Sequence, residues 1–216
     1  MKRILMLITL TQPLSLAAAP ASEIAWTPER LEFVKNGNSA KGKELASTCS
    51  GCHGDKGVSK MADYPSLAGQ NANYLYKQLR DYAGGYRDDP LMTSVAQGLS
   101  EQDAADLAAW FSSLPPPQNT GANKDNLARA EKLVESGDGK RILPPCFVCH
   151  GADGQGEKMD IPALAGQPAG YFSKTLMDYK NGSRHNDIYS RMRLIAQQLS
   201  DEEIKELAQY YQHFRQ

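Results

Sequence analysis

A five-residue pattern, Cys-x-x-Cys-His, occurs twice in this chain and uses all four of its cysteines. The copies occupy residues 49–53 (CSGCH) and 146–150 (CFVCH). This spacing is the attachment signature of c-type haem, in which two thiols add to the haem vinyl groups and the histidine supplies an axial nitrogen to iron. The sequence therefore predicts two covalently bound haem c groups. The residues that would hold them are Cys49, Cys52, His53, Cys146, Cys149 and His150.

Zinc sites and redox-active cysteine pairs share the C-x-x-C spacing and are the main alternatives. Neither requires a histidine directly after the second cysteine, and both pairs here have one. A disulfide or zinc site would also have to explain why the two pairs lie far apart in matching surroundings. We favour haem attachment.

The matching surroundings are an internal repeat. With a shift of 97 residues, 19 of the 39 positions in residues 49–87 are identical to their counterparts in residues 146–184, including D-x-P-x-L-A-G-Q in both copies. After a three-residue insertion in the second copy, the match resumes at a shift of 100. Such a repeat indicates a duplicated domain. We place the first domain at residues 22–114, a Pro-rich linker at 115–122 and the second domain at 123–216.

Each copy has the pattern of a helical domain. Ser100 and Ser200 are N-cap candidates, each with an acid three residues later and apolar residues following at helical spacing. A second helix is expected over about 71–82 and 169–180, and a third leads into each Cys-x-x-Cys-His motif. No stretch alternates apolar β-branched residues with polar ones, so we expect an all-α fold without a sheet.

The first 21 residues have the pattern of a cleavable signal peptide. Lys2 and Arg3 precede a short apolar run, and small residues lead to Ala21. The run is too short to span a bilayer. We therefore expect export to the periplasm and cleavage after Ala21.

The charge balance argues against nucleic-acid binding. Removing residues 1–21 takes away two of the 24 basic residues and none of the 25 acidic ones, so the mature chain is mildly acidic. No clustered Lys/Arg face is visible in the sequence, and such a face is what nucleic-acid recognition needs. We exclude nucleic acid as a partner.

The sixth iron ligand of each haem is expected to be a methionine, because a thioether suits the haem iron of electron carriers. Met92 and Met192 are related by the repeat and lie between the second and last helices of their copies. Met61 and Met159 follow their histidines too closely, and Met177 has no counterpart. We predict Met92 and Met192 as ligands, although core packing is the usual role of methionine.

Other residues recur at matching positions. Pro65 and Pro162 are turn residues that would bring a backbone carbonyl near each axial histidine, to bond its Nδ1 hydrogen. Arg87 and Arg184 are either solvated surface charges or partners of the haem propionates. His185 has no counterpart, and we expect it at the surface.

These motifs, followed in each copy by a tyrosine-containing helix, G-x-R and a late methionine, resemble those of the cytochrome c4 family. The resemblance spans about residues 38–213. It implies two tandem class I cytochrome c domains related by a pseudo-twofold axis, each enclosing one haem. It further implies a periplasmic electron carrier, not an enzyme, sometimes loosely attached to the membrane. A quinol–cytochrome c reductase or a dehydrogenase would reduce it, and a terminal oxidase would oxidise it.

An alternative from a different class is the dihaem cytochrome subunit of a periplasmic dehydrogenase, such as a flavocytochrome c sulfide dehydrogenase. Sequence alone separates these two functions poorly. A dihaem peroxidase fits less well, because it needs an iron with an open position and is a considerably larger protein.

Overall fold

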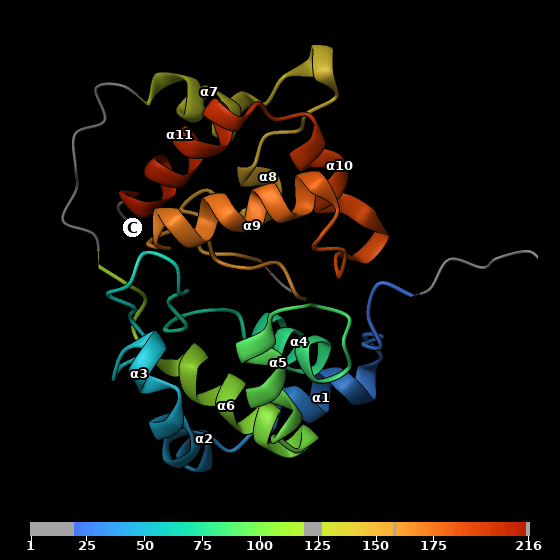
Figure 1. The fold of residues 1–216 in the computed structure, drawn as a ribbon, viewed down its shortest axis with the longest axis vertical. Helices are drawn as coiled ribbons and strands as arrows, with labels where there is room; N and C mark the ends of the chain where they lie inside the picture. Colours follow the sequence, from blue (N-terminus) through green and yellow to red (C-terminus); the bar gives the residue numbers. More distant parts are fainter. Residues whose placement is uncertain (1–19, 119–126, 158, 215–216) are drawn as a thin grey trace, which may run out of the picture.

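The computed structural model describes residues 20–118, 127–157 and 159–214, and it consists of two helical domains stacked along the long axis (Figure 1). Within these residues there are no strands, only two isolated bridges, Asp138 with Leu143 and Glu157 with Ile161. The expected all-α fold is confirmed. Of the sequence predictions, nearly all of the signal peptide and residues 119–122 of the linker lie outside the described residues.

The first domain is built around α6, against which α2, α4 and α1 pack. Gly42 permits the closest of these contacts, since a Cβ there would lie 2.0 Å from the carbonyl oxygen of Asp106. The helices of this domain are α1 (Pro28–Lys35), α2 (Ser39–Leu45), η1 (Ala46–Thr48), α3 (Ser50–His53), α4 (Ala72–Ala83), α5 (Pro90–Gln97) and α6 (Glu101–Ser113).

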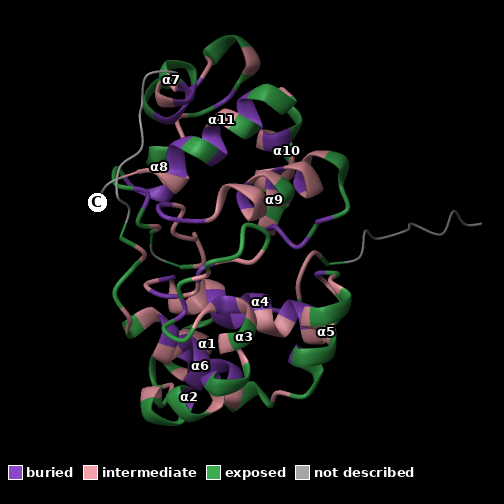
Figure 2. Cartoon of the chain, turned by 60° about the vertical axis from the view of Figure 1, so that its left-hand side comes forward, coloured by how far each residue is buried: buried purple, intermediate pink, exposed green. Residues whose placement is uncertain are grey.

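The second domain repeats this plan around α11, against which α7 and α9 pack, with α10 packed on α9. Buried residues line the inner faces of α6 and α11 in their respective domains (Figure 2). The helices are α7 (Ala128–Ser136), η2 (Gly139–Arg141), α8 (Phe147–His150), α9 (Ala169–Asn181), η3 (Ile188–Ser190), α10 (Arg191–Gln197) and α11 (Asp201–Gln212).

The predicted helix starts at Ser100 and Ser200 are confirmed. Each serine side chain accepts from the backbone N–H three residues later, and the acid there, Asp103 or Glu203, accepts from the serine N–H. These reciprocal capping boxes satisfy donors that a helix N-terminus otherwise leaves unpaired. The predicted second helices correspond to α4 and α9.

Helix α1, which sequence analysis did not predict, belongs to the first domain. Thr27 caps it and Pro28 opens it. The helix is short, and its stability comes from tertiary packing: Val34 is buried in the domain core, and Phe33 lies edge-on against Tyr76 at 6.1 Å. The segment ahead of the repeat is therefore part of the first hydrophobic core.

The Pro-rich stretch between the copies packs against both domains. A Cβ on Gly69 would lie 2.7 Å from a Pro116 side-chain atom, and one on Gly166 would lie 2.8 Å from Pro117. Both glycines have positive φ angles, +68° and +77°. Two matching turns thus meet two consecutive prolines at the junction of the domains.

Candidate functional site

A single cavity of about 1290 Å³ runs between the two domains and reaches both Cys-x-x-Cys-His motifs. It exceeds the roughly 300–1,000 Å³ of a pocket for one small ligand. Its lining contains every cysteine and both motif histidines, together with four tyrosines that pair under the 97-residue shift, Tyr74 with Tyr171 and Tyr82 with Tyr179. The cavity therefore has the size and the attachment groups for two large cofactors.

The first cysteine of each motif is the N-cap residue of a one-turn helix, α3 or α8, and the second lies inside that helix, so the two cysteines are one helical turn apart on the same side. Each helix ends at a glycine in the positive-φ region, Gly54 (φ 83°) or Gly151 (φ 84°). The following turn then binds the P-x-L-A-G-Q segment: the carbonyl of Gly57 accepts from Leu67 N–H at 2.7 Å, and Gly154 does the same for Leu164. These bonds hold the proline of each motif close to its histidine.

Both histidine rings are held by those proline carbonyls. The distance from His53 Nδ1 to the carbonyl oxygen of Pro65 is 2.9 Å, and the distance from His150 Nδ1 to that of Pro162 is also 2.9 Å. A carbonyl can only accept, so each Nδ1 carries the hydrogen and each Nε2 keeps its lone pair. Burial lowers the pKa of both histidines, although the carbonyl contacts act in the opposite direction. Each ring is thus a neutral, oriented nitrogen donor.

Among the five methionines that the structure describes, only Met92 and Met192 line the cavity. Each lies in the first turn of a short helix, α5 or α10, that sequence analysis did not predict. Met61 and Met159 are exposed, and Met177 packs against the core of the second domain. His185 is exposed and does not line the cavity.

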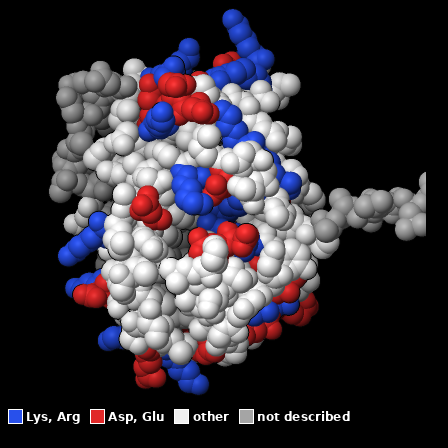
Figure 3. Space-filling model, viewed as in Figure 1, with Lys and Arg blue, Asp and Glu red and all other residues white. Residues whose placement is uncertain are grey.

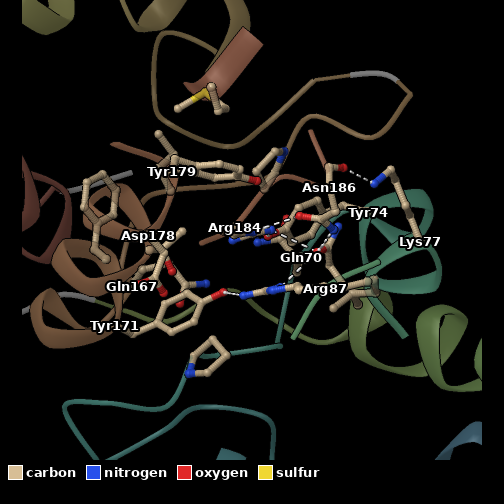
Figure 4. Close-up of a pocket in the computed structure, with 18 of the residues that line it drawn as sticks. Gln70, Tyr74, Lys77, Arg87, Gln167, Tyr171, Asp178, Tyr179, Arg184 and Asn186 are labelled. Atoms are coloured by element: carbon tan, nitrogen blue, oxygen red, sulfur yellow. Dashed lines mark hydrogen bonds between the residues drawn. The ribbon is translucent and has the colours of Figure 1, made fainter. Parts of the chain in front are cut away.

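Arg87 and Arg184 are buried at the centre of the cavity and each crosses the domain interface (Figure 4). Arg87 donates to the Tyr171 hydroxyl at 3.2 Å, and Arg184 donates to the Tyr74 hydroxyl at 3.2 Å. Both guanidinium groups also donate to Gln78 Oε1, at 2.9 Å. The two crossing bonds are equivalent under the 97-residue shift, so the interface has pseudo-twofold symmetry.

No described carboxylate forms a hydrogen bond with either arginine, and Arg184 Nη1 is buried without a partner. Two buried cations with neutral partners are costly unless an anion joins them. Burial would raise the pKa of the Tyr171 phenol, but the two guanidiniums outweigh it and lower this pKa to about 7. The cavity therefore favours anionic groups, which suits the propionates of haem.

A second polar cluster beside the arginines breaks the symmetry. Lys77 Nζ lies 2.5 Å from Asp81 Oδ2 and donates to the carbonyl of Asn186 at 2.6 Å. The Asn186 side chain donates in turn to Asp81 and Gln78. Asn186 belongs to the segment lengthened by the three-residue insertion, so this cluster has no equivalent on the other side.

The surface in Figure 3 carries mixed charge. Acidic and basic side chains alternate where the domains meet, and the acidic residues at the far end of the second domain are flanked by basic ones. This face offers no continuous basic stripe of the kind that nucleic acid requires.

Gln70 and Gln167 are interface residues whose role sequence analysis did not identify. Each binds the backbone of the opposite domain. The sequence feature that could have pointed to these two glutamines is their recurrence at the end of both P-x-L-A-G-Q motifs.

Comparisons with known proteins agree with this geometry. A family model described as Cytochrome c matches residues 39–115 and again 136–214. The chain is 38% identical to cytochrome c4 of Pseudomonas aeruginosa, over 82% of this chain and 88% of that protein. It is 34% identical to a thiosulfate dehydrogenase electron acceptor of Stutzerimonas stutzeri, over 77% of this chain and 78% of that protein.

Two solved structures are also similar. Reduced recombinant cytochrome c4 from Pseudomonas stutzeri has a TM-score of 0.79 at 35% identity, covering 83% of this chain and all of that one. Thiosulfate dehydrogenase TsdBA from Marichromatium purpuratum has a TM-score of 0.74 at 33% identity, covering 80% of this chain and 39% of that one. With two family-model matches and a relative covered almost end to end, this chain belongs to the cytochrome c4 family: it is a dihaem electron carrier whose two cytochrome c domains each bind one haem c covalently.

Proposed function

We propose that this protein works in the periplasm, taking electrons from a quinol–cytochrome c reductase or a dehydrogenase and passing them towards a terminal oxidase. The observation that carries this proposal is the shared cavity. It combines one buried histidine and one methionine from each domain with two attachment motifs. If each iron took one histidine and one methionine, no position would remain open for a substrate, so a carrier of this design would catalyse no transformation of its own.

The proposed axial ligands are His53 and Met92 in the first domain and His150 and Met192 in the second. The histidine assignments are supported by the Nδ1 contacts to Pro65 and Pro162, which leave each Nε2 available. A carbonyl partner of this kind fixes the ring and raises the basicity of a metal-bound imidazole. The methionine assignments are supported by the cavity lining.

Arg87 and Arg184 are proposed to bind haem propionates. Both are buried, and no carboxylate offsets their charge. A planar guanidinium suits a bidentate contact with a carboxylate. When bound, haem would supply the one-electron chemistry, and Arg87 and Arg184 would bind its propionates at the domain interface.

The ligand assignment is tested by Met92→Ala and Met192→Ala. Each substitution should remove about half of the near-infrared band that arises from thioether ligation of iron(III), and should open one iron to cyanide or carbon monoxide. Met61→Ala is a matched control, because Met61 is exposed and does not line the cavity. If Met192→Ala kept the full band, the ligand of the second domain would be another residue.

The proposed location is tested by fractionation and by sequencing the mature N-terminus, which we expect at Ser22. In support of this site, Ser22 belongs to the packed structure, because its hydroxyl donates to Asp81 at 2.5 Å. No helix among the described residues is long and apolar enough to cross a membrane. Recovery in the membrane fraction that salt reverses would indicate peripheral attachment instead of a free carrier.

A second candidate function is the electron acceptor or cytochrome subunit of a periplasmic dehydrogenase. It is supported by the relatives named as thiosulfate dehydrogenase electron acceptors and by the likeness to thiosulfate dehydrogenase TsdBA. Purification of the native protein separates the candidates. A dehydrogenase present in a stoichiometric amount would favour the second function, and a free dihaem protein that a terminal oxidase oxidises would favour the first.

A further inference from the structure

Two buried glutamines, Gln70 and Gln167, are labelled in Figure 4. Each forms hydrogen bonds with the backbone of the opposite domain, and the two sets of bonds are reciprocal. Gln167, from the second domain, accepts from Ser66 N–H at 3.1 Å through Oε1 and donates to the Ser66 carbonyl at 2.8 Å through Nε2. Gln70, from the first domain, accepts from Ala163 N–H at 2.7 Å and donates to the Ala163 carbonyl at 3.0 Å. Ser66 and Ala163 are equivalent under the 97-residue shift.

The orientation of each amide follows from its partners. A backbone N–H can only donate and a carbonyl can only accept, so the side-chain oxygen must face the first and the nitrogen the second. A flipped amide would lose both bonds and leave two buried backbone groups unpaired. Each glutamine is therefore locked to one residue of the opposite domain.

The residue that each glutamine binds, Ser66 or Ala163, directly follows the proline whose carbonyl accepts from the axial histidine, so the proline carbonyl and the bound N–H belong to one peptide group. The carbonyl of Pro65 accepts from His53 Nδ1 at 2.9 Å, and the N–H of the same peptide, on Ser66, donates to Gln167. The second domain repeats this, with Pro162 accepting from His150 and Ala163 donating to Gln70. Each histidine is thus joined, through one peptide group, to a side chain of the other domain.

A peptide group transmits polarisation because its C–N bond has partial double-bond character. When its N–H donates, electron density shifts towards its oxygen, which then accepts more strongly, and successive bonds in such a chain strengthen one another. A stronger Nδ1–H···O bond makes a metal-bound imidazole more basic. A more basic ligand stabilises iron(III) over iron(II).

We propose that Gln70 and Gln167 are crossed positioning residues, each lowering the reduction potential of the haem in the opposite domain through the peptide that holds its axial histidine. This inference rests on the proposed assignment of His53 and His150 as ligands. It makes the domain interface part of the environment of each iron, so that separating or shifting the domains changes both potentials.

The test uses the full holoprotein with Gln167→Leu and, separately, Gln70→Leu. Redox titration followed by NMR assigns each haem through contacts with residues of its own domain. Gln167→Leu should move the potential of the first-domain haem to a more positive value and leave the other unmoved. Gln70→Leu should do the reverse. A shift at the haem of the mutated domain, equal shifts at both haems, or no shift at either would each overturn the inference.

A second readout is the ¹⁵N chemical shift of the axial histidine Nδ1 in the reduced protein, which reports the strength of its hydrogen bond. Gln167→Leu should change this shift for His53 and not for His150, whereas a purely structural loosening would change both. If leucine prevents the holoprotein from accumulating, Gln167→Asn has the same expectation, because it breaks the contact by shortening the side chain by one methylene.

The unaltered protein provides the control for the assignment on which this rests. Two histidine rings should show the strong ring-current shifts of ligands lying over a porphyrin. Their absence would remove the proposed ligation itself. Their presence without the crossed pattern would remove only the role of the glutamines.

Discussion

The same lysine–aspartate pair occupies opposite environments in the two domains. Lys77 and Asp81 correspond under the repeat to Lys174 and Asp178, and both pairs have i,i+4 spacing on equivalent helices. The N–O distances are nearly equal, 2.5 and 2.6 Å. The side-chain exposures are 2% and 0% in the first domain but 63% and 27% in the second.

The difference arises from segments that the repeat does not share. Asn186, in the lengthened segment of the second domain, donates to Asp81 at 2.6 Å, and Ser22, ahead of the repeat, donates to the same carboxylate. In the second domain, Lys174 also donates to its partner Asp178, but no such segment covers it and its side chain stays exposed to solvent. The duplication therefore preserves the contact between the lysine and the aspartate, but the free energy of that contact depends on whether other segments bury the pair.

The largest predicted effect comes from breaking the buried pair. Asp81→Ala leaves the Lys77 ammonium buried without its counter-charge, which typically costs about 3–5 kcal/mol. Asp178→Ala, the matched substitution, should cost no more than about 0.5 kcal/mol, as exposed i,i+4 pairs do. Denaturant unfolding monitored through the haem signals of each domain measures both. Equal costs would contradict the comparison.

The second prediction concerns α1, which has no counterpart among the described residues of the second domain. Val34→Ala removes two buried methyl groups from the core, at about 0.8 kcal/mol each plus a cavity contribution, so we expect a loss of about 2 kcal/mol in the first domain alone. Lys35→Ala, on the exposed side of the same helix, should change the free energy of unfolding by less than about 0.5 kcal/mol. A matching loss in the second domain would show that the two cores unfold as one unit.

Much of the site could be predicted from sequence because its chemistry is local. The Cys-x-x-Cys-His motifs, the capping boxes and the recurrence of Met92 and Met192 are all carried by spacing along the chain. Helix α5 could also have been found, since Asp89 caps it and Pro90 opens it. Helix α10 has no such signal, because it follows Tyr189 and Ser190 in left-handed conformations and without a side-chain cap.

What sequence could not supply was long-range pairing. Arg191 and Arg193 flank Met192 and look alike in the sequence. Arg193, however, donates to the buried Asp187 at 2.8 Å, whereas Arg191 donates to the Ile188 carbonyl at 3.3 Å. Likewise, the sequence marked Gln70 and Gln167 as recurring without indicating that they bind the opposite domain. Such partners depend on how the two copies pack, which a single-chain pattern does not record.

The third prediction uses an ion pair found only in the second domain. Arg141 donates through two nitrogens to Glu203, each bond 2.8 Å long, whereas the equivalent Asp103 is held by Ser100. The hydrogen bond from Arg141 is the main cause that lowers the pKa of Glu203 below its usual 4.5. Because the folded-state pKa is the lower one, the stabilisation is present above pH 4.5 and is lost as the pH falls through the folded value.

Arg141→Gln should therefore destabilise the second domain by about 1 kcal/mol at pH 7, the upper end for partly exposed pairs, and by progressively less in acid. Unfolding curves recorded from pH 7 to pH 3 measure this convergence. A penalty that stays constant with pH would mean that Arg141 acts by packing and not by charge.

The smallest predicted effect is on the reduction potentials. Residues 22–114 carry 9 basic and 12 acidic side chains, a net charge of −3, whereas residues 123–216 carry 13 of each. A cationic surround favours the reduced iron, so the second-domain haem should have the higher potential.

Arg191 is close enough to act on His150, whose pKa is lowered first by burial and further by this charge. At a separation of about 10 Å in water, one charge contributes roughly 0.4 kcal/mol, or about 20 mV. Arg191→Gln should lower the potential of the second haem by about that amount and leave the first unchanged.

Arg193→Gln should have less effect, because the loss of the Arg193 charge also frees the buried Asp187 to attract another cation or a proton. Titrations of both variants at low salt, where screening is weakest, would make the difference clearest. A larger shift from Arg193→Gln, or a shift at the first haem, would show that local structure and not net charge sets the two potentials apart.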